Sequence, residues 1–192
     1  MRRGKKKQPT VILDRDGVIN KEGIDYVKNW DEFEFLPGVL EALAILHRQG
    51  VRTLVATNQS CVGRGIISRA DLEEIHTNML ARIRDAGGYI EKIYVCPCRP
   101  EEGCSCRKPL PGMLEEASRD FDLDLGECFF VGDAQTDISA GRRAGCRTVL
   151  VLTGKGADTL KRVENGETEQ PDMVAEDLPA AVKALQTHLF HD

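Results

Sequence analysis

Two carboxylates one residue apart, Asp14 and Asp16, follow a short apolar run at Thr10–Leu13. The run is rich in β-branched residues, which predicts a buried strand. Ligands of open parallel sheets bind beyond the carboxyl ends of the strands. Acids this close repel each other unless a cation lies between them or one of them is protonated. The pattern favours Mg²⁺, held by oxygen ligands and a substrate phosphate; the alternative is a solvated Asp-rich turn.

Small polar residues follow the second predicted strand, at 51–56. They are Thr57, Asn58, Gln59 and Ser60. Their hydroxyls, amides and the backbone N–H groups around them can hold phosphate oxygens. A simple polar turn is the alternative interpretation.

An acid also ends the fourth predicted strand, at 127–133. Asp137 follows Asp133 by four residues and falls in a predicted helix at 136–144. Residues four apart lie on the same side of a helix, one turn from each other. We therefore expect Asp137 on the same side as Asp133.

Four of the seven cysteines lie within eleven residues, after the third predicted strand at 90–95. They are Cys96, Cys98, Cys104 and Cys106. Two C-x-C pairs can close around one tetrahedral Zn²⁺, and four protein ligands make such a site structural. The ion would order a loop at 96–106 that has almost no apolar core. A redox-active cluster or free thiols are the alternatives.

A basic pair, Arg107 and Lys108, comes directly after the last cysteine of this loop. Arginine binds anions as a fork and lysine as a point charge, so the pair suits anion binding. A solvated basic pair is the alternative.

The remaining pattern alternates strands with helices. Pro37 opens a helix that Gly50 ends; further helices are predicted at 69–86, Gly112–Phe121 and Leu178–Leu189, and strands at 148–152 and Met173–Ala175. Residues 158–171 are polar and show no clear period. The segment 21–35 suits an ordered loop over the sheet edge, where substrate contacts or a lid could lie.

Alternating strands and helices predict an α/β fold: a Rossmann-like parallel sheet with helices on both faces. We expect one domain over residues 1–192, with no large cap, because the segment after Asp16 is short. All the polar strand ends then meet at one edge of the sheet. Together they supply a nucleophilic carboxylate, a second acid, metal ligands, a hydroxyl and a cation, which are the parts that phosphoryl transfer needs.

Composition is that of a soluble globular protein: 41% of the 192 residues are hydrophobic and 30% charged. No apolar run reaches membrane length. The basic residues in the first nine positions suggest a solvated tail rather than a signal peptide, so the cytoplasm is expected. A net charge of −5 disfavours a nucleic-acid partner. We expect a monomer with a small-molecule substrate.

The motifs resemble those of the haloacid dehalogenase superfamily, in the same order. They are Asp14-x-Asp16-Gly17-Val18, a hydrophobic strand before Thr57-Asn58, Lys108-Pro109, and Gly132-Asp133 with Asp137. From residue 11 to about residue 185, the chain more narrowly resembles the family of D-glycero-D-manno-heptose-1,7-bisphosphate 7-phosphatases. This resemblance rests on segments 14–20, 33–35, 57–60, 63–65, 106–109 and 111–114 and on the cysteine loop. That family usually has His where this chain has Cys98, so the zinc site would be all-thiolate.

The resemblance implies a role for each catalytic residue. Asp14 would attack phosphorus and become an aspartyl-phosphate. Asp16 would protonate the leaving sugar oxygen and then activate water. Mg²⁺ would be held by Asp14, the backbone carbonyl of Asp16, and Asp133. Thr57 and Lys108 would neutralise charge on the phosphoryl group.

Substrate specificity is expected from the neighbouring polar residues. Asn58, Gln59 and Ser60 would contact the substrate, and Arg107 would hold its second anion. Asp137 would support the metal ligands from behind. The resemblance implies removal of the C7 phosphate of heptose 1,7-bisphosphate, in the biosynthesis of nucleotide-activated heptose.

Two alternatives remain open. The same chemistry serves histidinol phosphate, whose phosphatases share the zinc loop, or a nucleic-acid 3′-phosphate. Alternatively, a zinc-loop module could bind nucleic acid through Arg107, Lys108 and the basic tail, although the acidic balance and the complete set of acids argue against this.

Overall fold

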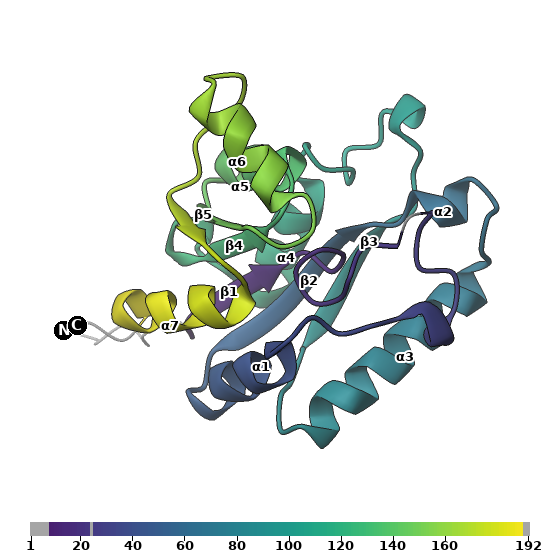
Figure 1. Ribbon diagram of the computed structural model, residues 1–192, viewed down its shortest axis with the longest axis horizontal. Coiled ribbons are helices and arrows are strands. Elements are labelled where there is room, and N and C mark those ends of the chain that lie inside the picture. The colour runs from purple at the N-terminus through teal and green to yellow at the C-terminus, as the bar shows by residue number, and fades with distance from the viewer. Residues whose placement is uncertain (1–7, 24, 190–192) are drawn as a thin grey trace.

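The computed structural model describes residues 8–23 and 25–189. Its strands form one parallel sheet in the order β3-β2-β1-β4-β5-β6 (Figure 1). Their bounds are Thr10–Leu13 for β1, Arg52–Asn58 for β2, Lys92–Cys96 for β3, Phe129–Gly132 for β4, Arg147–Val151 for β5 and Met173–Ala175 for β6. The expected parallel α/β architecture is therefore confirmed.

Strand β1 lies at the centre of the sheet, at the point where the strand order changes direction. Leu13 pairs with Val55 of β2 on one side and with Val131 of β4 on the other. Asp14, which follows Leu13, therefore lies at the same edge of the sheet as the ends of β2 and β4. Open α/β sheets bind their ligands at such a switch point.

Seven α-helices are assigned over the described residues. They are α1 (Val39–Arg48), α2 (Ser60–Gly63), α3 (Arg69–Asp85), α4 (Gly112–Phe121), α5 (Gln135–Ala144), α6 (Gly156–Glu164) and α7 (Leu178–Leu189). Three short 3₁₀ turns complete the set: η1 (Trp30–Glu32), η2 (Pro100–Glu102) and η3 (Leu125–Glu127). Ser68 and Asp71 form a capping box at the start of α3, which fixes where that helix begins.

The core consists of two layers, one on each face of the sheet. Along β1, Val11 and Leu13 pack in the layer formed with α1, α3 and α7, whereas Ile12 between them packs with α4 and α5. Successive side chains of a strand point to opposite faces, so a strand buried on both sides must be apolar throughout. Figure 1 shows the first group of helices together on one side of the sheet.

Several boundaries differ from those expected. Pro37 is not the first residue of α1; the helix begins at Val39, after Gly38 as N-cap with φ of 71°. Strand β2 extends through Thr57 and Asn58, because both continue the ladder to β3. The segment after Gln59 begins with the short helix α2.

Helix α6 is the main element that the sequence pattern missed. Residues 158–171 were expected to lack regular structure, yet Gly156–Glu164 is helical. Its buried positions are Gly156, Thr159 and Val163, which give a weak apolar stripe. A helix whose buried face is built mostly from small or polar residues has little hydrophobic periodicity to recognise.

The segment between β1 and α1 is compact, in keeping with the expected lack of a large cap. Among its described residues, η1 lies between loops that return to the turn after β1: the N–H of Lys21 donates to the carbonyl of Glu34, and that of Leu36 to the carbonyl of Ile19. The predicted basic tail lies, through residue 7, outside the described residues. Among the described helices, none combines the length and the apolar character needed to cross a bilayer.

Candidate active site

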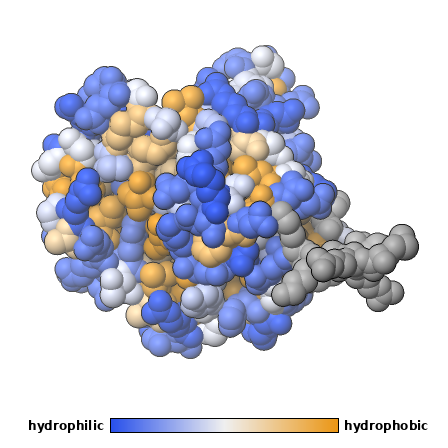
Figure 2. Space-filling model, turned by 180° about the vertical axis from the view of Figure 1, so that it is seen from behind, coloured by the Kyte–Doolittle hydropathy of each residue, from blue (hydrophilic) through white to orange (hydrophobic). Residues whose placement is uncertain are grey.

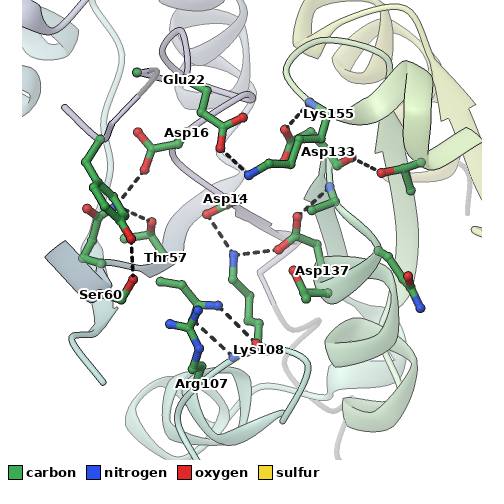
Figure 3. Close-up of a pocket in the computed structure, with 18 of the residues that line it drawn as sticks. Asp14, Asp16, Glu22, Thr57, Ser60, Arg107, Lys108, Asp133, Asp137 and Lys155 are labelled. Carbon is green, nitrogen blue, oxygen red and sulfur yellow. Dashed lines mark hydrogen bonds and ion pairs between the residues drawn. The ribbon is translucent and has the colours of Figure 1, made fainter. Parts of the chain in front are cut away.

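A cavity of about 1030 Å³ opens at the carboxyl edge of the sheet. The residues expected to act in catalysis, bind substrate, or bind magnesium and support its ligands all line it: Asp14, Asp16, Thr57, Asn58, Gln59, Ser60, Arg107, Lys108, Asp133 and Asp137. Figure 3 shows how these side chains from separate strand ends converge. In Figure 2 the molecule is hollowed at its upper edge, and hydrophilic side chains cover much of that face.

Lys108 lies at the centre of the acidic cluster. Its Nζ lies 2.8 Å from Oδ1 of Asp14 and 2.6 Å from Oδ1 of Asp137, and it donates to the carbonyl of Ala56 at 3.0 Å. Burial lowers the pKa of Lys108, but the charges of Asp137 and Asp14 outweigh burial and raise it above its usual value. The ammonium therefore stays charged and neutralises part of the cluster.

Both carboxylate oxygens of Asp137 have a partner. Its Oδ1 faces Lys108, and its Oδ2 accepts the backbone N–H of Ala134 at 2.9 Å, which caps the start of α5. The structure thus brings Asp137 to the site as the partner that holds the lysine in place.

Asp133 is held by two tight turns. Its Oδ2 accepts the N–H of Lys155 at 2.8 Å. A Cβ added at Gly17 or at Gly154 would lie 2.1 Å from that same oxygen, and both glycines have positive φ. The chain can approach the carboxylate this closely only without side chains at these positions.

The carboxylates of Asp14 and Asp133 are buried close to other acids, an environment in which a bound cation would stabilise their ionised forms. Burial raises the pKa of Asp14 to about 6, against the opposing effect of Lys108. Burial and the neighbouring Asp137 and Asp14 raise the pKa of Asp133 to about 8. Carboxylate oxygens of Asp14, Asp133 and Asp137 lie within 4.8 Å of one another. A divalent ion would relieve this repulsion, and oxygen-only ligands suit Mg²⁺.

Asp16 is held beside the cavity by three different residues. Nη2 of Arg15 donates to both carboxylate oxygens at 2.9 Å, Nδ2 of Asn20 donates to Oδ1 at 2.8 Å, and Nε2 of Gln59 donates to Oδ2 at 2.7 Å. Burial raises the pKa of Asp16, but the Arg15 charge and these hydrogen bonds outweigh it and lower the pKa below its usual value. The side chain is thus an ionised, well-oriented carboxylate that can accept a proton.

The polar residues that end β2 take different positions. Thr57 is buried in the cavity wall, where its Oγ1 accepts from Nε2 of Gln59 at 3.0 Å. Asn58 exchanges hydrogen bonds with the backbone of Lys108, donating at 3.1 Å and accepting at 3.2 Å. Ser60 lies 3.2 Å from the hydroxyl of Tyr26, between Oγ and OH. Asn58 therefore holds the backbone of Lys108 in place, and Gln59 connects Thr57 to Asp16, in addition to lining the cavity.

Comparisons with known proteins show the family to which the chain belongs. A family model for HAD-hydrolase-like proteins matches residues 105–181. The D-glycero-beta-D-manno-heptose-1,7-bisphosphate 7-phosphatase of Bordetella bronchiseptica is 42% identical over 91% of this chain and 96% of its own. That of Pseudomonas aeruginosa is 41% identical over the same shares. The chain belongs to the D-glycero-D-manno-heptose-1,7-bisphosphate 7-phosphatase family.

Solved structures extend the match to three dimensions. A crystal structure of the B. bronchiseptica D,D-heptose 1,7-bisphosphate phosphatase, complexed with magnesium and phosphate, superposes with a TM-score of 0.89. It is 40% identical to this chain and covers 94% of it and 99% of its own chain. L-2-haloacid dehalogenase from Xanthobacter autotrophicus, at 11% identity and a TM-score of 0.62, covers 93% of this chain and 98% of its own and shares the fold.

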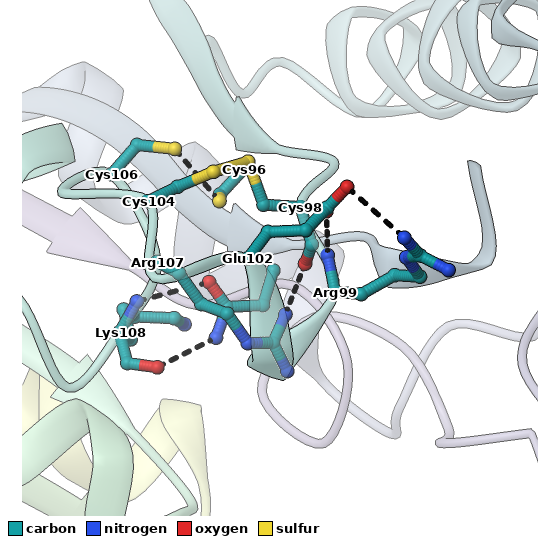
Figure 4. Close-up of a disulfide and its surroundings, with 9 residues drawn as sticks. Cys96, Cys98, Arg99, Glu102, Cys104, Cys106, Arg107 and Lys108 are labelled. Carbon is teal, nitrogen blue, oxygen red and sulfur yellow. Dashed lines mark hydrogen bonds and ion pairs between the residues drawn. A yellow bond between two sulfur atoms is a disulfide. The ribbon is translucent and has the colours of Figure 1, made fainter. Parts of the chain in front are cut away.

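The cysteine loop of this family member lies beside the cavity (Figure 4). Cys98 and Cys104 form a disulfide, and Sγ of Cys106 lies 2.8 Å from Sγ of Cys96. The four sulfur atoms therefore meet as expected, but this form does not hold the four free thiolates of the expected zinc site. Two of the sulfurs bond to each other instead.

Arg107 connects the cysteine loop to the cavity. Its Nη1 donates to the carbonyl of Cys98 at 2.8 Å, while the residue lines the cavity wall. The position of the guanidinium therefore depends on the conformation of the loop.

Several residues of the site were not expected from the sequence. Thr153 donates to the carbonyl of Gly17 at 2.6 Å, Lys155 forms an ion pair with Glu22 at the cavity mouth, and Tyr26 faces Ser60. The Thr-Gly-Lys-Gly turn after β5 carried a usable signal, because it follows another parallel strand whose end must reach the same edge. Glu22 and Tyr26 lie in the segment 21–35, where substrate contacts or a lid were expected but no individual residue was singled out.

Proposed function

We propose that this protein is a Mg²⁺-dependent phosphatase that removes the C7 phosphate of D-glycero-D-manno-heptose 1,7-bisphosphate. The observation that carries the proposal is the buried cluster of Asp14, Lys108, Asp133 and Asp137 on the cavity wall. The choice of substrate rests on the names of the relatives, and the type of reaction rests on this cluster. The product would enter the biosynthesis of nucleotide-activated heptose.

Asp14 is proposed as the nucleophile. Its carboxylate faces the cavity beside Lys108, whose charge would attract the phosphoryl oxygens and stabilise the charge that they carry in the transition state. Attack on phosphorus forms an aspartyl-phosphate and releases the sugar hydroxyl. Thr57, in the adjoining wall, would donate a hydrogen bond to a phosphoryl oxygen.

Asp16 is proposed as the proton carrier of both half-reactions. A bound phosphate would raise the pKa of the neighbouring Asp16 carboxylate, so that Asp16 takes up a proton with the substrate and passes it to the bridging ester oxygen as the P–O bond to the sugar breaks. The resulting carboxylate would then take a proton from the water that attacks the aspartyl-phosphate. The hydrogen bonds from Arg15, Asn20 and Gln59 favour the ionised form that the second half-reaction requires.

Magnesium would be held by Asp14, the backbone carbonyl of Asp16, and Asp133, where it would neutralise phosphate charge and orient the phosphoryl group. The mutually close oxygens and the raised pKa of Asp133 support this assignment. Asp137 would act by holding Lys108 rather than by binding the ion directly.

We also infer that the cysteine loop, in its reduced form, binds one structural Zn²⁺. Reduction of the Cys98–Cys104 disulfide would return two thiols next to those of Cys96 and Cys106. Sulfur atoms of Cys96, Cys98 and Cys106 already lie within 4.8 Å of one another. Four thiolates would complete a closed tetrahedral site.

The substrate proposal is tested by phosphate release from a panel of esters. Heptose 1,7-bisphosphate, histidinol phosphate and a 3′-phosphorylated oligonucleotide are compared at equal concentrations with Mg²⁺. We expect kcat/KM for the bisphosphate to exceed both others by at least about 100-fold, because the second anion adds binding contacts. Equal rates on histidinol phosphate, or faster release from the oligonucleotide, would replace the proposal by the corresponding alternative.

A further inference from the structure

A fully buried arginine lies directly behind the proposed proton carrier. Arg15, 1% exposed, places Nη2 at 2.9 Å from each carboxylate oxygen of Asp16, and its Nε donates to Oδ1 at 3.3 Å. A guanidinium is planar and binds a carboxylate as a fork, which fixes the plane of the carboxylate as well as its distance.

The other side of this guanidinium is held by a residue from a distant helix. Nη1 of Arg15 lies 3.1 Å from Nε2 of His76, which is 61 residues further along the chain, in α3. Arginine can only donate hydrogen bonds, so Nε2 of His76 must accept and the ring proton must be on Nδ1. His76 thus presents a fixed lone pair to the arginine.

The imidazole is itself fixed by the core. His76 is nearly buried, and its helix neighbours Ile75 and Met79 are fully buried in the layer between the sheet and α3. The chain of contacts therefore runs from a packed helix through His76 and Arg15 to the carboxylate of Asp16, whose side chain is 23% exposed and lines the cavity.

We propose that His76 is a positioning residue for the proton-transfer step: by holding Arg15, it orients the carboxylate of Asp16 toward the leaving oxygen of the substrate. The inference rests on the proposed role of Asp16. In that step the P–O bond to the sugar breaks, a bond from Asp14 to phosphorus forms, and the proton of Asp16 moves to the sugar oxygen. A proton donor that is out of line is inefficient even when it remains close, because transfer needs hydrogen-bond geometry.

The proposal makes a specific demand on the leaving group. A sugar alkoxide is a poor leaving group and needs the proton, whereas p-nitrophenolate is a stable anion that leaves without one. Loss of orientation at Asp16 should therefore slow phosphoryl transfer from a sugar ester more than from p-nitrophenyl phosphate. The parameter kcat/KM reports the steps up to departure of the leaving group, so later hydrolysis of the intermediate does not mask the difference.

The experiment compares three variants of the full-length enzyme with Mg²⁺ on both substrates. His76→Leu fills the site without an acceptor, and His76→Gln keeps an acceptor near the position of Nε2. Ile75→Val removes one methylene group from the same helix turn and leaves His76 in place. Arg15→Lys, which keeps the charge but loses the fork, provides a second route to the answer if His76→Leu does not fold. Thermal unfolding is recorded for every variant.

We expect His76→Leu to lower kcat/KM for the sugar phosphate by about 10-fold and for p-nitrophenyl phosphate by less than about 2-fold. Arg15→Lys should show the same inequality, while His76→Gln and Ile75→Val should keep the wild-type ratio of the two values. The inference would be overturned if, in both His76→Leu and Arg15→Lys, the ratio of kcat/KM for the sugar phosphate to kcat/KM for p-nitrophenyl phosphate equalled that of the wild type. This holds whether both values fall equally or neither falls.

The outcome is separable from the fate of the proposed function. Each comparison is a ratio within one variant, and it can use any sugar phosphate that the wild-type enzyme hydrolyses. A wild-type enzyme that prefers another ester would reject the proposed substrate and leave the His76 test intact. A preference for the bisphosphate together with equal losses in the variants would reject the role of His76 alone.

Discussion

At the scale of single residues, the site depends on how Lys108 shares its charge between two buried acids. The ammonium lies within 2.8 Å of both Asp14 and Asp137. A buried carboxylate without such a partner would be costly to ionise, so the ionised forms of Asp14, the proposed nucleophile, and of Asp137 depend on the lysine. Binding of a phosphate adds negative charge that the same ammonium can attract.

Replacement of the proposed nucleophile should abolish turnover. In Asp14→Asn the amide cannot attack phosphorus, and we expect kcat to fall by more than about 10³-fold with the fold preserved. Circular dichroism controls for folding, and phosphate release in Mg²⁺ is the measurement. Retention of more than a few per cent of the wild-type rate would show that no covalent aspartyl-phosphate forms at this position.

Arg107 should affect substrate preference more than chemistry. It lines the cavity without contacting the acids, so Arg107→Ala should lower kcat/KM for the bisphosphate by about 10-fold or more and change p-nitrophenyl phosphate hydrolysis much less. Arg99→Ala, in the same loop but outside the cavity lining, serves as the control. A similar loss on both substrates would assign Arg107 to the structure of the loop instead.

Residue types and spacing alone could indicate the cluster but not its internal contacts. Asp14, Lys108 and Asp133 each end or follow a strand of a parallel sheet, so their convergence follows from topology. That Asn58 holds the backbone of Lys108, and that Gln59 joins Thr57 to Asp16, depends on side-chain directions that no spacing encodes.

At the scale of elements, the cysteine loop couples a covalent cross-link to the cavity. Its 3₁₀ turn η2 has no buried residue, so the cysteines supply much of what holds the loop. Because Arg107 donates a hydrogen bond to the carbonyl of Cys98, a change in the conformation of the loop would move the guanidinium in the cavity wall.

Metal content should report the state of the cysteine loop. Protein purified under reducing conditions should contain one Zn²⁺ per chain, and Cys104→Ser should lose most of it, because a tetrahedral thiolate site needs all four ligands. Cys146→Ala, outside the loop, is the control and should keep the metal. Full zinc in Cys104→Ser would exclude the proposed four-cysteine site.

The elements that the sequence pattern indicated best are those with strong apolar runs. The buried strands and α7 match closely, since nearly every inward position is apolar. Helix α6 was missed because Thr159 uses its hydroxyl to bind the carbonyl of Asp133 rather than contributing an apolar side chain. A polar contact of this kind depends on where β4 ends in the folded structure, so the sequence pattern cannot predict it.

At the scale of the whole molecule, the central position of β1 places its acid between the two halves of the sheet. One half supplies Thr57 and Lys108, and the other supplies Asp133 and Asp137. The site therefore exists only when both halves have folded together. Groups buried near this junction should contribute to the stability of the entire fold.

The pH dependence of unfolding should contain a contribution from His76. Burial and the charge of Arg15 lower its pKa from 6.5 to about 3, so the folded protein keeps the ring neutral. Below pH 6.5 the unfolded chain binds a proton that the folded chain does not, and stability falls as the pH decreases toward 3. At pH 5 the loss should reach about 2 kcal/mol relative to neutral pH.

Denaturant unfolding of wild-type protein and His76→Gln at pH 7 and pH 5 measures this contribution. The difference between the two pH values should be smaller in the variant by about 2 kcal/mol, since other acids titrate equally in both proteins. An identical pH response in the two proteins would show that His76 is protonated in the folded state.

The most direct test of the central claim is ³¹P NMR of the products formed from heptose 1,7-bisphosphate and Mg²⁺. We expect inorganic phosphate and heptose 1-phosphate in equal amounts, with the C1 phosphate signal retained. With Asp14→Asn, both signals of the substrate should persist. Loss of the C1 phosphate, or no cleavage while histidinol phosphate is hydrolysed, would contradict the proposed function.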